Sequence, residues 1–224
     1  MSYFDHLRSH LFKDLRLEWR SRDAMNAMGF FALLVVVIFS FSFEPSSEES
    51  RLISGGILWV AILFATNVAL NQSWTRETRN HVLDALRLAP APPTALFLGK
   101  SIGNFIFVLT LELIMVPLLT VFYNLSAAGS YFDLIVIALL GTWALVVNGT
   151  FFATLSLRTR IREMMLPLLL FPISIPALLC MVKGTTLALT GEASPLAYMK
   201  LLAGYDIIFT VVCLLLFETV FQAE

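Results

Sequence analysis

Six long apolar runs, separated by short charged segments, constrain this chain more than any other feature of its sequence. The runs lie at residues 24–43, 52–73, 101–123, 134–157, 164–182 and 202–221. An α-helix needs about 20 apolar residues to cross the hydrocarbon core of a bilayer, and each run approaches or exceeds that length. Backbone groups in lipid must be paired within their own segment, which excludes single strands and open loops there. We therefore predict an all-α polytopic membrane protein with six transmembrane helices.

Composition supports this prediction. Hydrophobic residues make up 58% of the chain and charged residues 14%, whereas soluble domains carry roughly 25% charged residues. A membrane-spanning β-barrel would show alternating segments of about ten residues, and the sequence contains none. No segment between the runs is long enough for a soluble domain. We expect a single transmembrane domain over residues 1–224, with the six-helix bundle at 24–223.

The basic residues predict how the helices are oriented. Twelve of the 15 lysines and arginines lie in three segments: the first 23 residues, the loop at 74–100 and the segment after the fourth run. The other three, Arg51, Lys183 and Lys200, lie on the alternate loops. Loops rich in lysine and arginine stay in the cytoplasm. Both termini and the loop at 74–100 are therefore predicted to be cytoplasmic. The charge pattern does not separate a bacterial inner membrane from an organellar one, and the bacterial inner membrane is the default expectation.

The segment at 1–23 has the periodicity of an amphipathic helix. Apolar residues recur at helical spacing at Phe4, Leu7, Leu11, Leu15 and Trp19. The basic residues lie mostly off this stripe, which suits a helix at the cytoplasmic interface with its cations near anionic head groups. A simple membrane anchor and a site for a specific partner both remain open.

The loop at 74–100 contains a second short amphipathic segment. Its apolar stripe and flanking charges consist of Val82, Leu83, Asp84, Leu86 and Arg87. A cluster of prolines at 90–93 follows, and proline ends a helix. A short helix held there can press on a soluble partner, or it can lie flat on the lipid.

The sequence lacks the residue patterns of an active site. It has no haem-attachment motif, no pair of metal-binding histidines in a spanning run and no glycine-elbow serine. The tripeptide at 99–101, Gly-Lys-Ser, matches the last three residues of a phosphate-binding loop motif. That motif requires glycine five residues before its Gly-Lys pair, and this chain has Thr94 there. We predict no catalytic residue and no metal site. If ATP drives this chain, another subunit must bind the ATP.

Polar residues inside the runs are candidates for function because lipid makes them costly. Glu112 lies well inside the third run. A carboxyl group there has two explanations: a functional role in a substrate pathway or in coupling, and a structural role in an interhelical hydrogen bond. Asn67 and Asn148 can bond between helices, and a structural role is favoured for both. Asp206 and Glu218 are expected near the ends of the last helix, within reach of water.

The fifth run is punctuated by Pro167, Pro172 and Pro176. Each removes a backbone hydrogen bond and is expected to kink the helix. Kinked membrane helices line transport paths or move in some proteins and are static in others. Gly99 and Gly103 form a small-residue pair that allows close helix packing.

Three local features, in this order along the chain, resemble one protein family. They are the opening of the second run at 55–65, the loop with its leucines and prolines followed by Gly99 and Lys100, and the proline-rich stretch at 166–176. Together with the chain length and the six-run layout, they resemble the haem exporter protein B (CcmB) family over nearly the whole chain.

The resemblance implies the permease subunit of an ABC transporter in cytochrome c biogenesis. It implies a separate CcmA-like ATPase, CcmC-like and CcmD-like membrane subunits, a CcmE-like haem chaperone and a homodimer within the complex. The implied work is to couple ATP hydrolysis to haem export or to release of the haem-loaded chaperone. Haem is then a transported or handled substrate, and the runs contain no histidine that could bind its iron. The segment around Leu83 and Leu86 is expected to dock into the ATPase.

Other functions remain open on the sequence alone. A different six-helix ABC exporter, moving a lipid, a drug or a polysaccharide, has the same topology and also needs an ATPase. An ion-coupled secondary transporter would use Glu112 as a proton carrier and work without an ATPase, although no inverted repeat is visible. A scaffold that only assembles other subunits would be indifferent to ATP hydrolysis.

Overall fold

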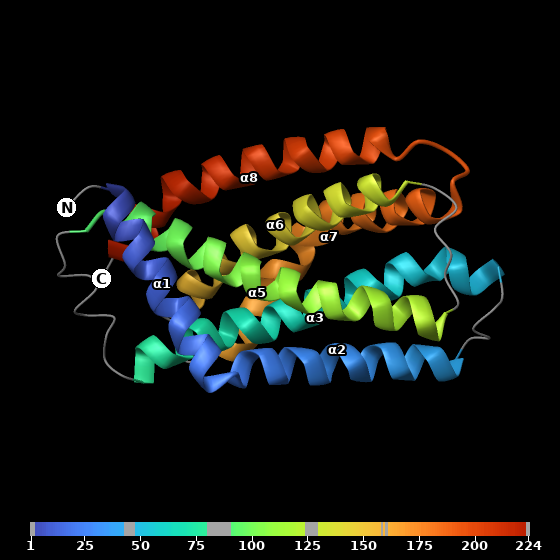
Figure 1. Cartoon of the computed structure of the whole chain (residues 1–224). Helices are drawn as coiled ribbons and strands as arrows, with labels where there is room; N and C mark the ends of the chain where they lie inside the picture. The colour runs from blue at the N-terminus through green and yellow to red at the C-terminus, as the bar shows by residue number, and fades with distance from the viewer. Residues whose placement is uncertain are drawn as a thin grey trace.

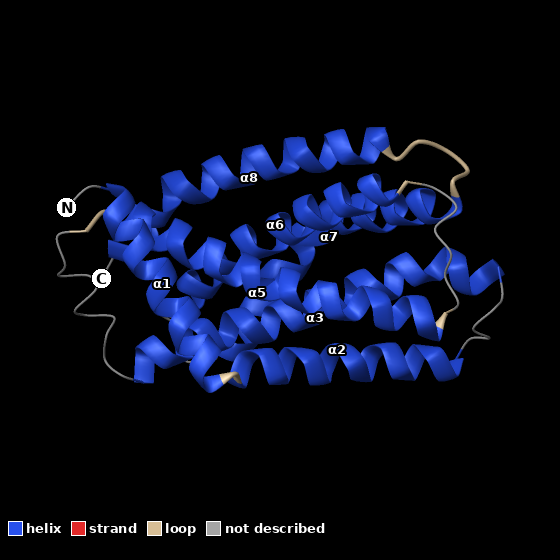
Figure 2. Cartoon of the chain, viewed as in Figure 1, coloured by secondary structure: helices blue, strands red, loops and turns tan. Residues whose placement is uncertain are grey.

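The computed structural model of the protein describes residues 3–42, 48–79, 91–123, 130–157, 159 and 161–222. These residues form helices joined by short connections, with no strand among them (Figure 2). The helices are α1 (Tyr3–Ser21), α2 (Asp23–Ser42), α3 (Glu48–Arg79), α5 (Pro93–Phe122), α6 (Tyr131–Ser156), α7 (Arg162–Thr190) and α8 (Leu196–Gln222). The predicted all-α class is confirmed.

Six of these helices are long and apolar enough to cross a membrane, as predicted. They run alternately up and down, and both chain termini lie at the same end of the bundle (Figure 1). We call this the basal end; it includes the starts of α2, α5 and α7 and the ends of α3, α6 and α8. The opposite end is the distal end.

The helix α1 lies outside the set of six and crosses α5 at the basal end (Figure 1). A single residue, Arg22, joins α1 to α2 and has a left-handed φ of 57°, which is uncommon for a residue other than glycine. Glu18 supports this corner by accepting a hydrogen bond from the Met25 backbone N–H at 3.0 Å. The corner fixes the direction in which α1 leaves the bundle.

The apolar stripe predicted for α1 divides between two environments. Leu7, Leu11 and Leu15 are half-buried against the bundle, whereas Phe4 and Trp19 are exposed at its two ends. The apolar stripe is not buried along its whole length because the face of α1 that contacts the bundle also carries polar side chains. These include the buried Glu18 and the half-buried Asp14.

Five of the six spanning helices are longer than the apolar runs that predict them, and α5, α7 and α8 are examples. α5 begins at Pro93 because Pro92 caps it and proline suits the first helical turn, where a backbone N–H is not needed. α7 continues to Thr190 and ends at Gly191, whose φ of 71° gives a left-handed cap. α8 begins at Leu196, six residues before the run. The prolines at 92 and 93 thus start a helix, and much of the loop at 74–100 is helical.

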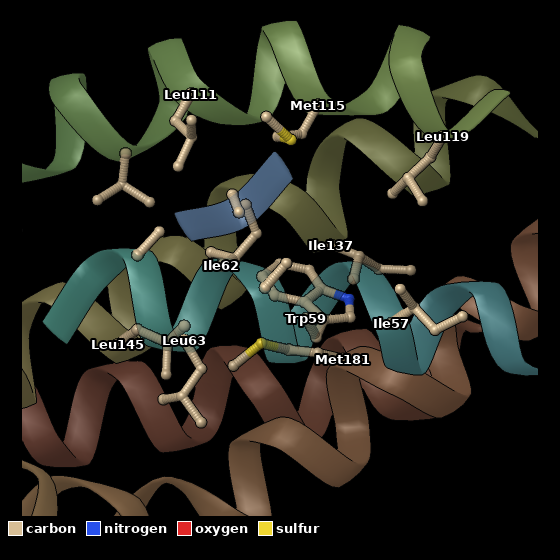
Figure 3. Packing of buried hydrophobic residues seen from close by; sticks show 14 of the residues in the cluster. Ile57, Trp59, Ile62, Leu63, Leu111, Met115, Leu119, Ile137, Leu145 and Met181 are labelled. Carbon is tan, nitrogen blue, oxygen red and sulfur yellow. The ribbon is translucent and has the colours of Figure 1, made fainter. Parts of the chain in front are cut away.

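The interior of the bundle is packed around Trp59 of α3. Figure 3 shows its ring at the centre of a buried cluster, next to Met181 of α7, with Leu111 and Met115 of α5 on the facing helix. The ring also lies against the backbone of α6, where a Cβ added to Gly141 would be 2.5 Å from Trp59 Cη2. The absence of a side chain at 141 is therefore what lets α3 and α6 pack this closely.

Candidate functional site

A buried lysine lies at the centre of a charge cluster at the basal end. Lys100, in the second turn of α5, is 1% exposed. Its Nζ lies 3.2 Å from Asp14 Oδ2 in α1 and 3.0 Å from Glu77 Oε1 near the end of α3. The same ammonium group lies 4.5 Å from the centroid of the Trp74 ring. Buried charges need pairing and hydrogen bonds, and these contacts supply both.

Lys13 of α1 completes the cluster from its more exposed side. Its Nζ lies 2.5 Å from Glu77 Oε1 and 3.4 Å from Asp14 Oδ1. Burial acts to lower the pKa of Lys13, but the carboxylates of Asp14 and Glu77 outweigh it and raise that pKa above its ordinary value. The charge cluster of Lys13, Asp14, Glu77 and Lys100 therefore holds two positive and two negative groups and is formally neutral.

In the same region α1 and α5 approach each other closely. A Cβ added to Gly99 would lie 3.0 Å from His10 Cβ and 3.2 Å from the Leu7 carbonyl oxygen. Small residues let helix backbones approach in this way. The close packing expected of Gly99 joins α5 to α1. Burial in this contact, followed by the charge of Lys13, lowers the pKa of His10.

The charge cluster holds together three segments that are distant in sequence: α1, the last turns of α3 and the first turns of α5. Residues 80–90 connect α3 to α5, so the cluster lies at both ends of that connection. The residues predicted to dock into an ATPase fall outside the described part of the chain: Val82, Leu83, Asp84, Leu86 and Arg87. Their role stays a prediction, and what the structure describes is the anchor of the segment that carries them.

Glu112 lies within the spanning part of α5, ten residues before its distal end, or ~15 Å along the helix. Its carboxyl group is buried, and its Oε1 accepts a hydrogen bond from the Thr142 hydroxyl of α6. Its Oε2 is also buried and has no hydrogen-bond partner among the described residues. The structure therefore contains both the interhelical bond of a structural role and an unpaired polar atom of the kind that binds ligands.

A cavity of about 400 Å³ lies beside Glu112 in the distal half of the bundle. Its walls come from four helices and include Leu58 and Trp59 of α3, Leu134 of α6 and Thr185 of α7. The Trp59 indole N–H donates to Thr185 Oγ1 at 2.9 Å, which holds the ring against the wall. This volume lies within the ~300–1,000 Å³ typical of small-molecule sites.

The two intramembrane asparagines have different surroundings. Asn148 of α6 donates to the Tyr205 hydroxyl of α8 at 3.0 Å, and its Oδ1 lies 3.8 Å from the Cys213 sulfur. Asn67 accepts from Asn71 at 2.9 Å, four residues along the same helix. Asn148 therefore joins two spanning helices, whereas the hydrogen bond of Asn67 with Asn71 stays within α3.

The helix α7 continues through Pro167, Pro172 and Pro176. Proline disturbs the backbone hydrogen bonds of the preceding turn, and neighbouring helices in membranes often pair the groups it leaves. Here the Tyr205 hydroxyl donates at 2.9 Å to the carbonyl oxygen of Ile173, three residues before Pro176. This contact ties the proline-rich part of α7 to α8 and, through Tyr205, to Asn148.

Asp206 lies much deeper than the sequence predicts. Because α8 begins at Leu196, Asp206 is ten residues, or ~15 Å, from the distal end of that helix. It is buried, and neither carboxyl oxygen has a hydrogen-bond partner within the described part of the chain. The expectation that it reaches water at a helix end is wrong for Asp206, whereas Glu218 is exposed near the basal end.

The described residues contain no group of three His, Cys, Asp or Glu side chains placed to hold a metal ion. The charge cluster is the main feature that sequence reasoning missed. The third apolar run starts after Lys100, so the sequence predicts this lysine in a loop, whereas the structure places it inside α5. The available signal was that Lys100 lies seven residues after Pro93, inside an otherwise apolar stretch that begins with a helix-starting proline.

Comparison with known proteins places this arrangement in a family. The family model described as CcmB protein matches residues 6–221. The Heme exporter protein B of Rhodobacter capsulatus is 34% identical over 173 residues, which cover 77% of this chain and 79% of the relative. The Heme exporter protein B of Paracoccus denitrificans is 26% identical over 88% of this chain and 89% of its own length. That of Pseudomonas aeruginosa is 28% identical over 71% of each.

These matches cover α1 and all six spanning helices. They confirm the resemblance drawn from the glycine-rich start of the second run, the loop and the proline-rich helix. The chain belongs to the CcmB protein family.

Proposed function

We propose that this chain is the membrane permease subunit of an ABC transporter complex that handles haem in cytochrome c biogenesis. The observation that carries the proposal is the family match at residues 6–221 of a six-helix membrane protein whose relatives are named Heme exporter protein B. The whole chain acts as one transmembrane domain. It is a transporter subunit, and a separate CcmA-like ATPase supplies the ATP hydrolysis.

The basal end faces the cytoplasm, with both termini, in the inner membrane of a bacterium. Twelve of the 15 basic residues lie in the segments at that end, as the positive-inside rule requires. The exposed surface of α1 supports this placement. Arg8 lies 5.3 Å from the Phe12 ring and Arg22 lies 6.0 Å from the Trp19 ring, a pairing of cations and aromatics suited to lipid head groups.

ATP-driven motion enters the chain through the segment at 80–90. A force on this segment is transmitted directly to the charge cluster, because Glu77 precedes the segment and Lys100 follows it. Both residues form ion pairs with α1. The segment, α1, α3 and α5 therefore respond as one unit. From there, Tyr205 and Asn148 connect the proline-rich α7 with α6 and α8.

The partners follow from the family. They are a CcmA-like ATPase, CcmC-like and CcmD-like membrane subunits and a CcmE-like haem chaperone, with two copies of this chain in the complex. Haem is the substrate of the complex, and the work of this chain is haem export or release of the loaded chaperone.

Complementation tests the function. In a bacterium whose own CcmB-family gene is deleted, this chain is expected to restore c-type cytochromes, measured by covalent haem staining of membrane proteins. The Rhodobacter capsulatus relative serves as the positive control, and an empty plasmid as the negative control. If the chain accumulates in the membrane together with the other subunits and no cytochrome c forms, the proposed function is wrong.

Substitution of Leu83 and Leu86 by aspartate tests the coupling segment. Apolar anchors at the centre of an interface carry most of its binding energy, so the double variant should reduce recovery of the ATPase with the tagged chain by about tenfold or more. Mass spectrometry of the affinity-purified complex measures this ratio. The variant chain alone should keep the wild-type unfolding midpoint. Unchanged recovery of the ATPase would exclude these leucines from the interface.

A further inference from the structure

The cavity beside Glu112 opens on the flank of the bundle, between α5 and α6. The side chains at its rim are among the more exposed apolar residues of the protein, with Leu113 at 76% and Ile135 at 59% exposed. Both lie on spanning helices, so this flank faces lipid in the membrane. Glu112 lies ~15 Å along α5 from the distal end of the helix, well within a hydrocarbon core of about 30 Å. A molecule that enters therefore comes from the lipid phase.

The lining is complementary to an apolar body with one small polar group. Most of the wall is aliphatic, and its polar groups include the buried carboxyl of Glu112 together with the buried hydroxyls of Ser54 and Thr185. The Oε1 of Glu112 is occupied by the Thr142 hydroxyl, and its Oε2 has no partner in the part of the chain that the structure describes. A buried polar atom left unpaired is costly, and a bound ligand that pairs with it removes that cost.

A hydroxyl group matches Oε2 whichever protonation state Glu112 has. It donates to the oxygen of a carboxylate and accepts from the O–H of a carboxylic acid. A charged head group is costly at this depth in the bilayer. A plain acyl chain fills the apolar volume and leaves Oε2 unpaired.

The same lining does not suit haem. Among the described residues around the cavity there is no lysine or arginine to pair with carboxylates of a ligand, and no histidine, cysteine or methionine to bind iron. Tyrosine can also bind haem iron, but Tyr131 lies at the rim, where it is 69% exposed. When Glu112 is ionised, it also opposes a second carboxylate. The lining therefore favours an uncharged ligand over haem.

We propose that the cavity between α5 and α6 is a binding site for an uncharged membrane amphiphile that carries a hydroxyl group, which hydrogen-bonds to Glu112 Oε2. The site takes its ligand laterally from the leaflet at the distal end of the bundle. This inference does not rest on the proposed function, since it uses neither haem nor ATP.

Fluorescence of Trp59 tests the proposal, because this ring forms part of the cavity wall. The purified full chain, with its other three tryptophans changed to phenylalanine, is titrated in lipid nanodiscs with three bromine-labelled quenchers of equal length: ω-bromododecanol, bromododecane and ω-bromododecanoate. We expect saturable quenching by the alcohol at about tenfold lower concentration than by the alkane, as one added hydrogen bond to a buried group predicts. The carboxylate should quench least.

Variants locate the binding. Glu112→Leu should abolish the preference for the alcohol over the alkane, whereas Glu218→Leu, an exposed glutamate at the basal end, should keep it. Ala138→Phe fills the cavity from a half-buried wall position and should remove saturable quenching by all three probes, even if Glu112→Leu does not fold.

Three outcomes would overturn the proposal. Equal quenching by alcohol and alkane in the wild-type chain means that an ordinary acyl chain occupies the cavity. Preference for the carboxylate means that the site takes an anion. Loss of quenching on dimerisation of the chain in larger nanodiscs means that a second copy covers this flank. Because the measurement needs no other subunit, its failure leaves the complementation result unaffected, and the reverse also holds.

Discussion

Replacing Lys100 with methionine is expected to lower the free energy of unfolding by about 3–5 kcal/mol, the usual effect of breaking a buried ion pair from one side. Methionine fills a similar volume, so the loss is electrostatic. Glu77 is 5% exposed, and without Lys100 its remaining cation among the described residues is Lys13, which must also serve Asp14. The variant leaves a net negative charge in a site that is mostly buried. Titration with denaturing detergent in mixed micelles, followed by circular dichroism, measures the change.

Two comparisons separate this effect from a general loss of charge. Lys200→Met removes an exposed lysine at the distal end and should change stability by no more than about 0.5 kcal/mol. The double variant Lys100→Met, Glu77→Met leaves the pair of Lys13 and Asp14, which is neutral again, and should recover at least half of the loss. Equal stability of Lys100→Met and Lys200→Met would show that the charge cluster does not hold the basal end together.

The sequence predicts the six helices well because the bilayer imposes one demand on all of them. A run of about 20 apolar residues in lipid has no stable alternative to a helix. The ends of the helices were less predictable, since they depend on caps. Pro92 and Pro93 look like a stop signal and in fact begin α5, and Gly191 ends α7 eight residues beyond the apolar run.

The errors in the ends explain the errors in the site. The sequence predicts Asp206 near a helix end because the sixth apolar run begins six residues after the true start of α8. It predicts Lys100 in a loop because the third apolar run begins eight residues after the true start of α5. The sequence predicts that Glu112 is an intramembrane carboxyl group because it stands alone in an apolar run, and in the structure it is buried within α5. Its partner Thr142 and the cavity beside it are products of tertiary packing between α5 and α6, which no single segment encodes.

The packing of α3 against α6 leads to the second large prediction. Gly141→Ala should destabilise the protein by about 1–3 kcal/mol, the usual cost of overpacking a filled core. The new Cβ would lie 2.5 Å from Trp59 Cη2 and 2.7 Å from the Met181 sulfur. Trp59 cannot swing away freely, because its indole N–H is bonded to Thr185 and the residue is 2% exposed. The same titration in mixed micelles measures the change.

Gly204→Ala is the matched control, since a Cβ at that position meets nothing within 4 Å. Alanine is the better helix former by roughly 1 kcal/mol, so this variant should be neutral or slightly more stable. A double-mutant cycle then assigns the cost of Gly141→Ala to one contact. In a Trp59→Phe background the ring no longer reaches α6, and the penalty at 141 should fall by about 1 kcal/mol or more. If the penalty is the same in both backgrounds, Trp59 is not what requires glycine at 141, and the contact with Met181 of α7 accounts for the cost instead.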